Sequence, residues 1–161
     1  MTEFNIDDHK FCEPHFLEDV TIGQKFYIPS RTQTDAMFTM FQAVSGDNHP
    51  VHYDEVYLKK RGHKGLLAHG LQVLAQAAPG AGILPHYFGD AIIAITETTA
   101  KFLGPVYSGD TLYPMLEVIS IEPRRTTGTV VVRATIHNQD SELVMDGTHT
   151  ILVKKRNPDP K

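Results

Sequence analysis

The chain has 161 residues, of which 41% are apolar and 21% are charged, and its formal net charge at pH 7 is −4. These values are typical of a globular protein, and the negative net charge gives no reason to expect a nucleic-acid partner, whose usual footprint is a basic stripe. No apolar run approaches the ~20 residues that cross a bilayer, so we expect no membrane partner. The polar start, residues 1–10, is no signal peptide, and the single cysteine, Cys12, excludes an internal disulfide. We therefore expect one cytoplasmic domain, residues 1–161.

The first predicted elements are a short strand and two helices. Residues 24–31 predict the strand. Residues 34–45 carry apolar side chains at helical spacing, with Thr34 as the N-terminal cap and Gly46 at the C-terminal end. Asp54 is expected to cap a second, short helix.

The second half of the chain predicts one buried helix and then strands. Residues 65–78 are apolar on nearly every side of a helix, which is typical of a helix covered by other elements. Four segments rich in Val, Ile and Thr, separated by turn residues, predict long strands: 91–103, 111–121, 127–137 and 143–154. This order favours an α+β fold with a mostly antiparallel sheet wrapped on a central helix. The leader, residues 1–15, and the tail, residues 157–161, are expected to be irregular.

The segment Ser45-Gly46-Asp47-Asn48-His49-Pro50-Val51-His52 contains the strongest functional signal. In a helix, side chains five positions apart would point roughly 140° away from each other, and Pro50 also disfavours a helix here. The segment therefore predicts a tight loop that directs Asp47 and His52 at one point. A carboxylate and an imidazole that converge on one water molecule form a general acid/base pair.

This segment resembles the motif of the MaoC-like hydratases, relatives of the (R)-specific enoyl-CoA hydratases, which runs S-G-D-x-N-P-[IVL]-H-x-D. Here it stands as residues 45–54, with His49 in the place of asparagine. Residues 16–24, 67–71 and 102–112 resemble other parts of the family, so the resemblance spans about residues 16–154. It implies a hot-dog fold and a homodimer, or a dimer of dimers, whose sheets join edge to edge. It also implies an acyl-CoA thioester as substrate, entering along the subunit boundary.

The residues support hydration of an α,β-unsaturated acyl-CoA, or the reverse dehydration. Asp47 and His52 are expected to activate the water, one as base and the other as proton donor. The N–H group of Gly70, at a buried helix start, is expected to stabilise the charge on the thioester oxygen. The resemblance implies an (R)-3-hydroxyacyl-CoA product, and no cofactor is expected beyond the coenzyme A thioester of the substrate. Four further residues are predicted to contact substrate: Phe41, His49, Tyr53 and His69.

Other interpretations stay open at this stage. Asp47 and His52 suit a loop-bracing role, and together with His49 and Asp54 they have metal-ligand chemistry, although Pro50 and the short spacing strain such a site and we predict no metal. Hot-dog thioesterases commonly place an acid on the central helix, whereas residues 63–89 contain no Asp or Glu. A non-catalytic acyl-thioester binder or regulatory subunit is a third alternative. The sequence leaves open the acyl group, coenzyme A versus acyl carrier protein, the physiological direction, and which of Asp47 and His52 is the base.

Overall fold

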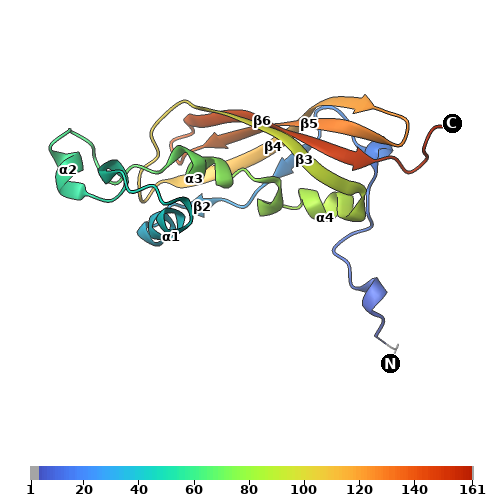
Figure 1. The fold of residues 1–161 in the computed structure, drawn as a ribbon, viewed down its shortest axis with the longest axis horizontal. Helices are drawn as coiled ribbons and strands as arrows, with labels where there is room; N and C mark the ends of the chain where they lie inside the picture. The colour runs from blue at the N-terminus through green and yellow to red at the C-terminus, as the bar shows by residue number, and fades with distance from the viewer. Residues whose placement is uncertain (1–3, 161) are drawn as a thin grey trace.

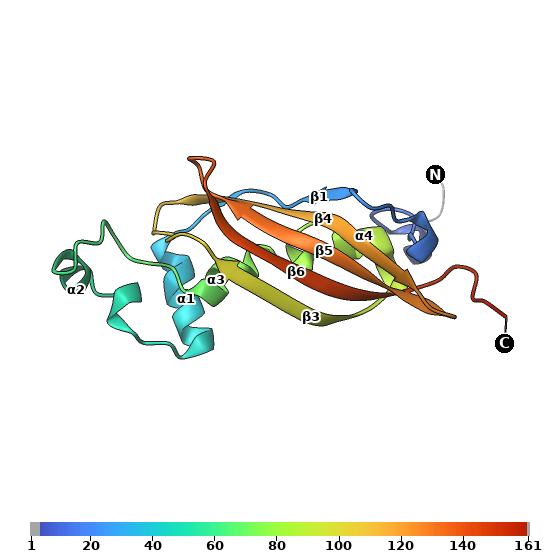
Figure 2. The same ribbon diagram turned by 90° about the horizontal axis from the view of Figure 1, so that it is seen from above.

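The computed structural model of the protein describes residues 4–160 and is built on one antiparallel sheet. A short strand, β2, pairs with β4 (Figure 1), and the other strands run in the spatial order β1-β4-β5-β6-β3 (Figure 2). The four long strands lie within two residues of the predicted segments. The strands are β1 (Lys25–Tyr27), β2 (Arg31–Thr32), β3 (Ile92–Phe102), β4 (Thr111–Pro123), β5 (Thr127–His137) and β6 (Leu143–Lys154).

Figure 2 shows that α3 and α4 lie against one face of this sheet, while α2 projects beyond one end of it. The arrangement is the α+β hot-dog architecture that the sequence predicts. The α-helices are α1 (Asp35–Ser45), α2 (Glu55–Lys59), α3 (Gly70–Ala75) and α4 (Leu84–Phe88). Short 3-10 turns are Ile6–Asp8, Leu17–Asp19, Pro50–His52, Pro79–Ala81 and Gly89–Ala91. Of the predicted irregular ends, residues 1–3 and 161 lie outside the described residues.

The first two helices begin and end where local chemistry places them. Thr34 is the N-cap of α1, and Gly46 ends the helix in the left-handed conformation with φ 70°. Asp54 caps α2 by accepting a hydrogen bond from the N–H of Tyr57 at 2.9 Å. The bounds of both helices and the Asp54 cap confirm the predictions, whereas Thr34 occupies the N-cap position of α1 without a side-chain capping hydrogen bond.

The predicted helix over residues 65–78 is much too long. Only α3, six residues from Gly70 to Ala75, is α-helical. The backbone before it pairs instead with a distant segment: Ala68 N–H donates to Val106 O at 2.8 Å, and Ser108 N–H donates to Leu66 O at 2.9 Å. Because these bonds occupy the groups that a helix would use, residues 66–68 are extended, and α3 begins at Gly70.

The core lies between the sheet and the helices. On strand β5 the predicted core residues Val130, Val132, Ala134 and Ile136 are all fully buried. The predicted alternation is incomplete, because Thr129 and Thr135 on the other face are buried as well. From the helical side, Phe38 of α1 and Val73 of α3 pack into the same core. Removing such side chains from water stabilises the fold by about 1.5–3 kcal/mol each.

Buried His149 ties the end of the α3 segment to the sheet. Its Nε2 donates to Ala77 O at 3.1 Å, and its Nδ1 accepts from the hydroxyl of Thr98 at 2.9 Å. Burial lowers the pKa of His149, which therefore stays neutral at pH 7. In residues 4–160 no helix combines the length and apolar character needed to cross a membrane.

Candidate active site

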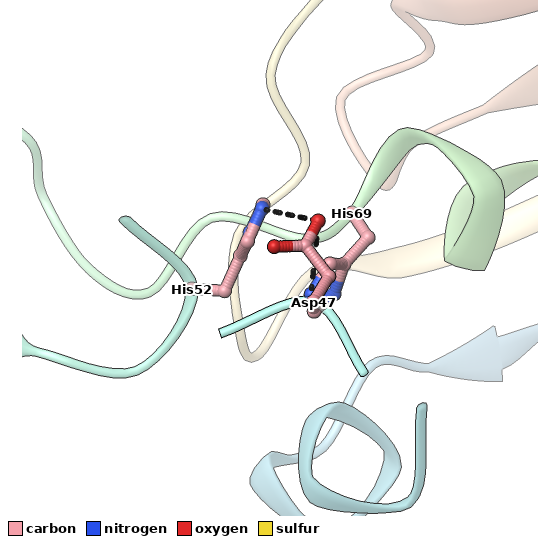
Figure 3. Close-up of side chains that lie close together, drawn as sticks. All are labelled: Asp47, His52 and His69. Carbon is pink, nitrogen blue, oxygen red and sulfur yellow. Dashed lines mark ion pairs between the residues drawn. The ribbon is translucent and has the colours of Figure 1, made fainter. Parts of the chain in front are cut away.

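The loop after α1 fixes one side of the Asp47 carboxylate. Gly46 turns the chain out of the helix, and the N–H of Asp47 donates to Ser45 Oγ at 3.2 Å. The N–H of His49 donates to Asp47 Oδ1 at 3.1 Å. One carboxylate oxygen is thus held by the backbone, while the other, Oδ2, faces two imidazole rings (Figure 3).

The first of these rings, His52, presents a lone pair to Asp47. Its Nδ1 lies 2.6 Å from Leu67 O, and a carbonyl oxygen only accepts, so Nδ1 carries the proton of the neutral ring. Nε2 is then unprotonated and lies 3.8 Å from Asp47 Oδ2 (Figure 3). This separation is too long for a direct hydrogen bond and short enough for one water molecule to bridge. The loop therefore brings together the two side chains that its sequence predicts to converge.

The second ring, His69, lies directly beside Asp47 and His52, whereas the sequence predicts for it only a contact with substrate. It is only 3% exposed, and its Nε2 lies 3.9 Å from the same Asp47 Oδ2. The rings of His69 and His52 stack with centroids 3.6 Å apart and planes 23° apart. The available sequence signal was its position directly before Gly70, at the start of the helix. The structure thus brings Asp47, His52 and His69 together, whereas the sequence predicts that only Asp47 and His52 converge.

The other predicted contact residues divide into two groups. Tyr53 Oη lies 2.8 Å from His69 Nε2, and the ring of Phe41 lies 4.8 Å from that of His69, so both adjoin the three-residue cluster. His49 is exposed, and its Nδ1 accepts from the N–H of Val51 at 3.3 Å. It caps the turn Pro50–His52, so its ring braces the loop by accepting a hydrogen bond. Its predicted contact with substrate stays a prediction.

Gly70 follows His69 and opens α3, so its N–H has no acceptor within the helix. A Cβ added here would lie 2.8 Å from Cε2 of Phe102, closer than real side chains approach. The space beside this backbone is therefore filled by an aromatic ring, and Gly70 offers only main-chain groups.

A protein-family model described as "MaoC like domain" matches residues 18–139. The chain belongs to the MaoC-like family. It is 33% identical over 141 residues to an uncharacterized protein of Bacillus subtilis, covering 86% of this chain and 99% of that one. It is 26% identical over 149 residues to an (R)-specific enoyl-CoA hydratase of Rhodospirillum rubrum, covering 88% and 94% of the two chains. A solved R-hydratase of Pseudomonas aeruginosa, in its unliganded form, superposes with a TM-score of 0.74 at 28% identity, covering 88% and 86%.

The surroundings set the protonation states of this MaoC-like site. The His49 N–H, and then the positive charge that His52 and His69 can carry, hold the pKa of Asp47 below its usual range. Burial, and next the stacked His69, hold the pKa of His52 below its ordinary value of 6.5, and outweigh the opposite effects of Leu67 O and Asp47. At neutral pH the site therefore combines a carboxylate with a neutral imidazole.

The cluster also has metal-ligand chemistry, since Asp47, His52 and His69 each offer an atom within 4.8 Å of the others. The sequence suggests His49 and Asp54 as the other possible ligands, but both side chains cap turns or helices, and His69 stands beside Asp47 and His52 instead. Two imidazoles bind one ion only when their in-plane lone pairs converge, and stacked rings hold those lone pairs nearly parallel. The arrangement therefore suits a water molecule better than a metal ion.

Proposed function

We propose that this protein hydrates α,β-unsaturated acyl-CoA thioesters, or catalyses the reverse dehydration, with Asp47 and His52 holding the reacting water. The observation that carries the proposal is the 3.8 Å separation of Asp47 Oδ2 from a His52 nitrogen that lacks a proton. Similarity to an (R)-specific enoyl-CoA hydratase and to an R-hydratase structure supports the substrate class and an (R)-3-hydroxyacyl-CoA product.

The protonation states favour His52 as the base. A bridging water donates one hydrogen bond to Asp47 Oδ2 and the other to His52 Nε2. As the water oxygen bonds to the β-carbon, one of its protons passes to His52, and the π electrons move towards the thioester oxygen. The imidazolium then returns that proton to the α-carbon on the same face, and the thioester carbonyl forms again. Asp47 stays ionised and stabilises the transient imidazolium, so one histidine serves both proton-transfer steps.

The N–H of Gly70 is the proposed donor to the thioester oxygen. It belongs to the residue directly after His69, whose Nε2 lies 3.9 Å from the Asp47 carboxylate. A fixed donor of this kind typically contributes about 3–4 kcal/mol to transition-state stabilisation. With only six residues in α3, we assign this contribution to the local N–H group rather than to a long helix dipole.

The edge of the sheet supports a homodimer. Among the described strands, β3 is paired only with β6, which leaves its other edge open. Apolar side chains on β3 are also exposed, with Ile93 at 46% and Ile95 at 47%. A long strand with unpaired backbone groups and exposed apolar side chains is a template for a second chain. We propose that two copies join along β3.

Sedimentation equilibrium tests this assembly. The expected mass is twice the 18.0 kDa of one chain, and a charge at the edge, Ile95→Lys, should weaken the association. A mass of one chain at every concentration from micromolar upwards would contradict the proposed homodimer.

The Asp47→Asn and His52→Gln variants test the catalytic roles. Each should lower kcat/KM for hydration of a short enoyl-CoA by about a hundredfold or more, because each removes one partner of the reacting water. Hydration is followed by loss of the conjugated-thioester absorbance, and thiol release is measured in parallel to detect thioester hydrolysis.

Matched controls are Asp90→Asn and His86→Gln, which change the same residue types at exposed positions away from the cluster. Both should retain wild-type rates. Full hydration activity in both Asp47→Asn and His52→Gln would exclude the proposed roles, and release of thiol without hydration would favour a thioesterase.

The pH dependence of kcat/KM tests which form of His52 acts. Because burial lowers the pKa of His52, its neutral base form persists below pH 6.5, and the Asp47 carboxylate persists to still lower pH. The rate should therefore be level near pH 7 and fall only below pH 6.5, as His52 gains a proton. An acidic limb with its midpoint above pH 6.5 would contradict a neutral His52 base.

A further inference from the structure

A chain of three buried polar side chains leads away from the active site into the core. His69, Gln72 and Gln33 are 3%, 2% and 0% exposed. His69 Nδ1 lies 3.2 Å from Gln72 Oε1, and Gln72 Nε2 donates to Gln33 Oε1 at 3.3 Å. Buried amides are costly unless they are hydrogen-bonded, and most of the segment around Gln72 is apolar. The proposed water chemistry does not use either glutamine.

The direction of these hydrogen bonds determines which ring nitrogen of His69 carries the proton. The carbonyl oxygen of Gln72 only accepts, so His69 Nδ1 must donate to it. His69 Nε2 then carries a lone pair and accepts from the hydroxyl of Tyr53, 2.8 Å away. The other proton position would place an N–H at Nε2, facing Asp47.

The far end of the chain is held by the backbone. The N–H of Gln33 donates to Asp110 O at 2.8 Å, and its carbonyl accepts from the N–H of Gly109 at 2.7 Å. Gln33 is therefore fixed next to the start of β4, and its side-chain oxygen orients the amide of Gln72. The backbone bonds thus fix where the Gln33 side chain begins, and its Oε1 holds the Gln72 amide, while Gln33 Nε2 has no hydrogen-bond partner among the described residues.

The orientation matters because His69 Nε2 and His52 Nε2 face the same oxygen, Asp47 Oδ2, at 3.9 and 3.8 Å. An N–H at His69 Nε2 is too far from that oxygen for a direct hydrogen bond, but it would point into the space between Oδ2 and His52 where the reacting water is proposed to lie. With the proton on Nδ1, His69 directs no N–H at that water, and Oδ2 stays available to it. The titratable groups in contact with His69 are Asp47, His52 and Tyr53.

Building on the proposed hydratase, we infer that Gln72, oriented by Gln33, is a positioning residue that fixes the tautomer of His69 and so keeps Asp47 Oδ2 free for water. The same bonds make Tyr53 a donor to His69 rather than to Asp47. Burial, followed by the charge of Asp47, raises the pKa of Tyr53, so its hydroxyl keeps the proton that it donates.

Two substitutions at position 72 separate this role from simple packing. Gln72→Leu keeps the side chain's approximate size but removes the acceptor for His69 Nδ1. Gln72→Glu keeps an acceptor oxygen at the same place. The matched control is Gln76→Leu, because Gln76 lies one helical turn further on and is also buried, and its amide bonds to the backbone oxygen of Gln72 rather than to His69.

The primary measurement is the tautomer of His69, read from ¹⁵N chemical shifts in long-range ¹H–¹⁵N correlation spectra at pH 7.5. The wild-type protein and Gln76→Leu should carry the proton on Nδ1. Gln72→Leu should move a substantial share of it to Nε2, and Gln72→Glu should restore Nδ1. A proton on Nε2 in the wild-type protein would overturn the inference, whether or not the variants fold, and so would an unchanged tautomer in folded Gln72→Leu.

Kinetics supply the second measurement. Gln72→Leu should lower kcat/KM by about tenfold, as loss of a supporting partner typically does, while Gln76→Leu should match the wild-type rate. Gln72→Glu should recover most of the wild-type rate, because its side-chain oxygen again accepts from His69 Nδ1. Wild-type kinetics in folded Gln72→Leu would contradict the positioning role. Because the tautomer is read without substrate, failure to hydrate any enoyl-CoA would reject the proposed function and leave the spectroscopic test intact.

Discussion

The site depends first on the hydrogen bond from His52 Nδ1 to Leu67 O, 2.6 Å long. This bond determines which nitrogen of His52 is free to face Asp47. It also joins two segments that are otherwise separate, since the N–H of Leu67 donates back to Val51 O at 3.2 Å. Leu67 is in turn bridged to Tyr107 beside the sheet. His52 is therefore held, through the backbone of Leu67, to the segment that connects β3 and β4.

Burial has two effects on the side chains around this bond. It keeps His52 neutral at physiological pH, which suits a base, while Asp47, with its side chain 48% exposed, stays ionised. It also favours hydrogen bonds between buried polar groups, as in the chain from His69 through Gln72 to Gln33, although Gln33 Nε2 and Gln76 Oε1 have no partner in the part of the chain that the structure describes. The same preference holds His149 between Ala77 and Thr98. The polar groups of α3 are thus ordered by the core that surrounds them.

Local chemistry explains which parts of the structure could be predicted from the sequence. Gly46 and Pro50 determine the loop that carries Asp47, and the alternation around Val130 determines which face of β5 is buried, so both are readable from neighbouring residues. The length of α3 depends on bonds between residues 66–68 and 106–108, which no local pattern reveals. The Gln72 to Gln33 contact joins positions 39 residues apart, and the stacking of His69 on His52 likewise needs the folded chain.

The central claim is that Asp47 and His52 act on one shared water, and a double-mutant cycle tests it most directly. The measured quantity is kcat/KM for enoyl-CoA hydration in the wild-type protein, Asp47→Asn, His52→Gln and the double variant. If the two groups hold the same molecule, removal of either already disables it, and the double variant should be about as slow as the slower single variant. Losses that multiply in the double variant would show that the two side chains act independently and would contradict the shared water.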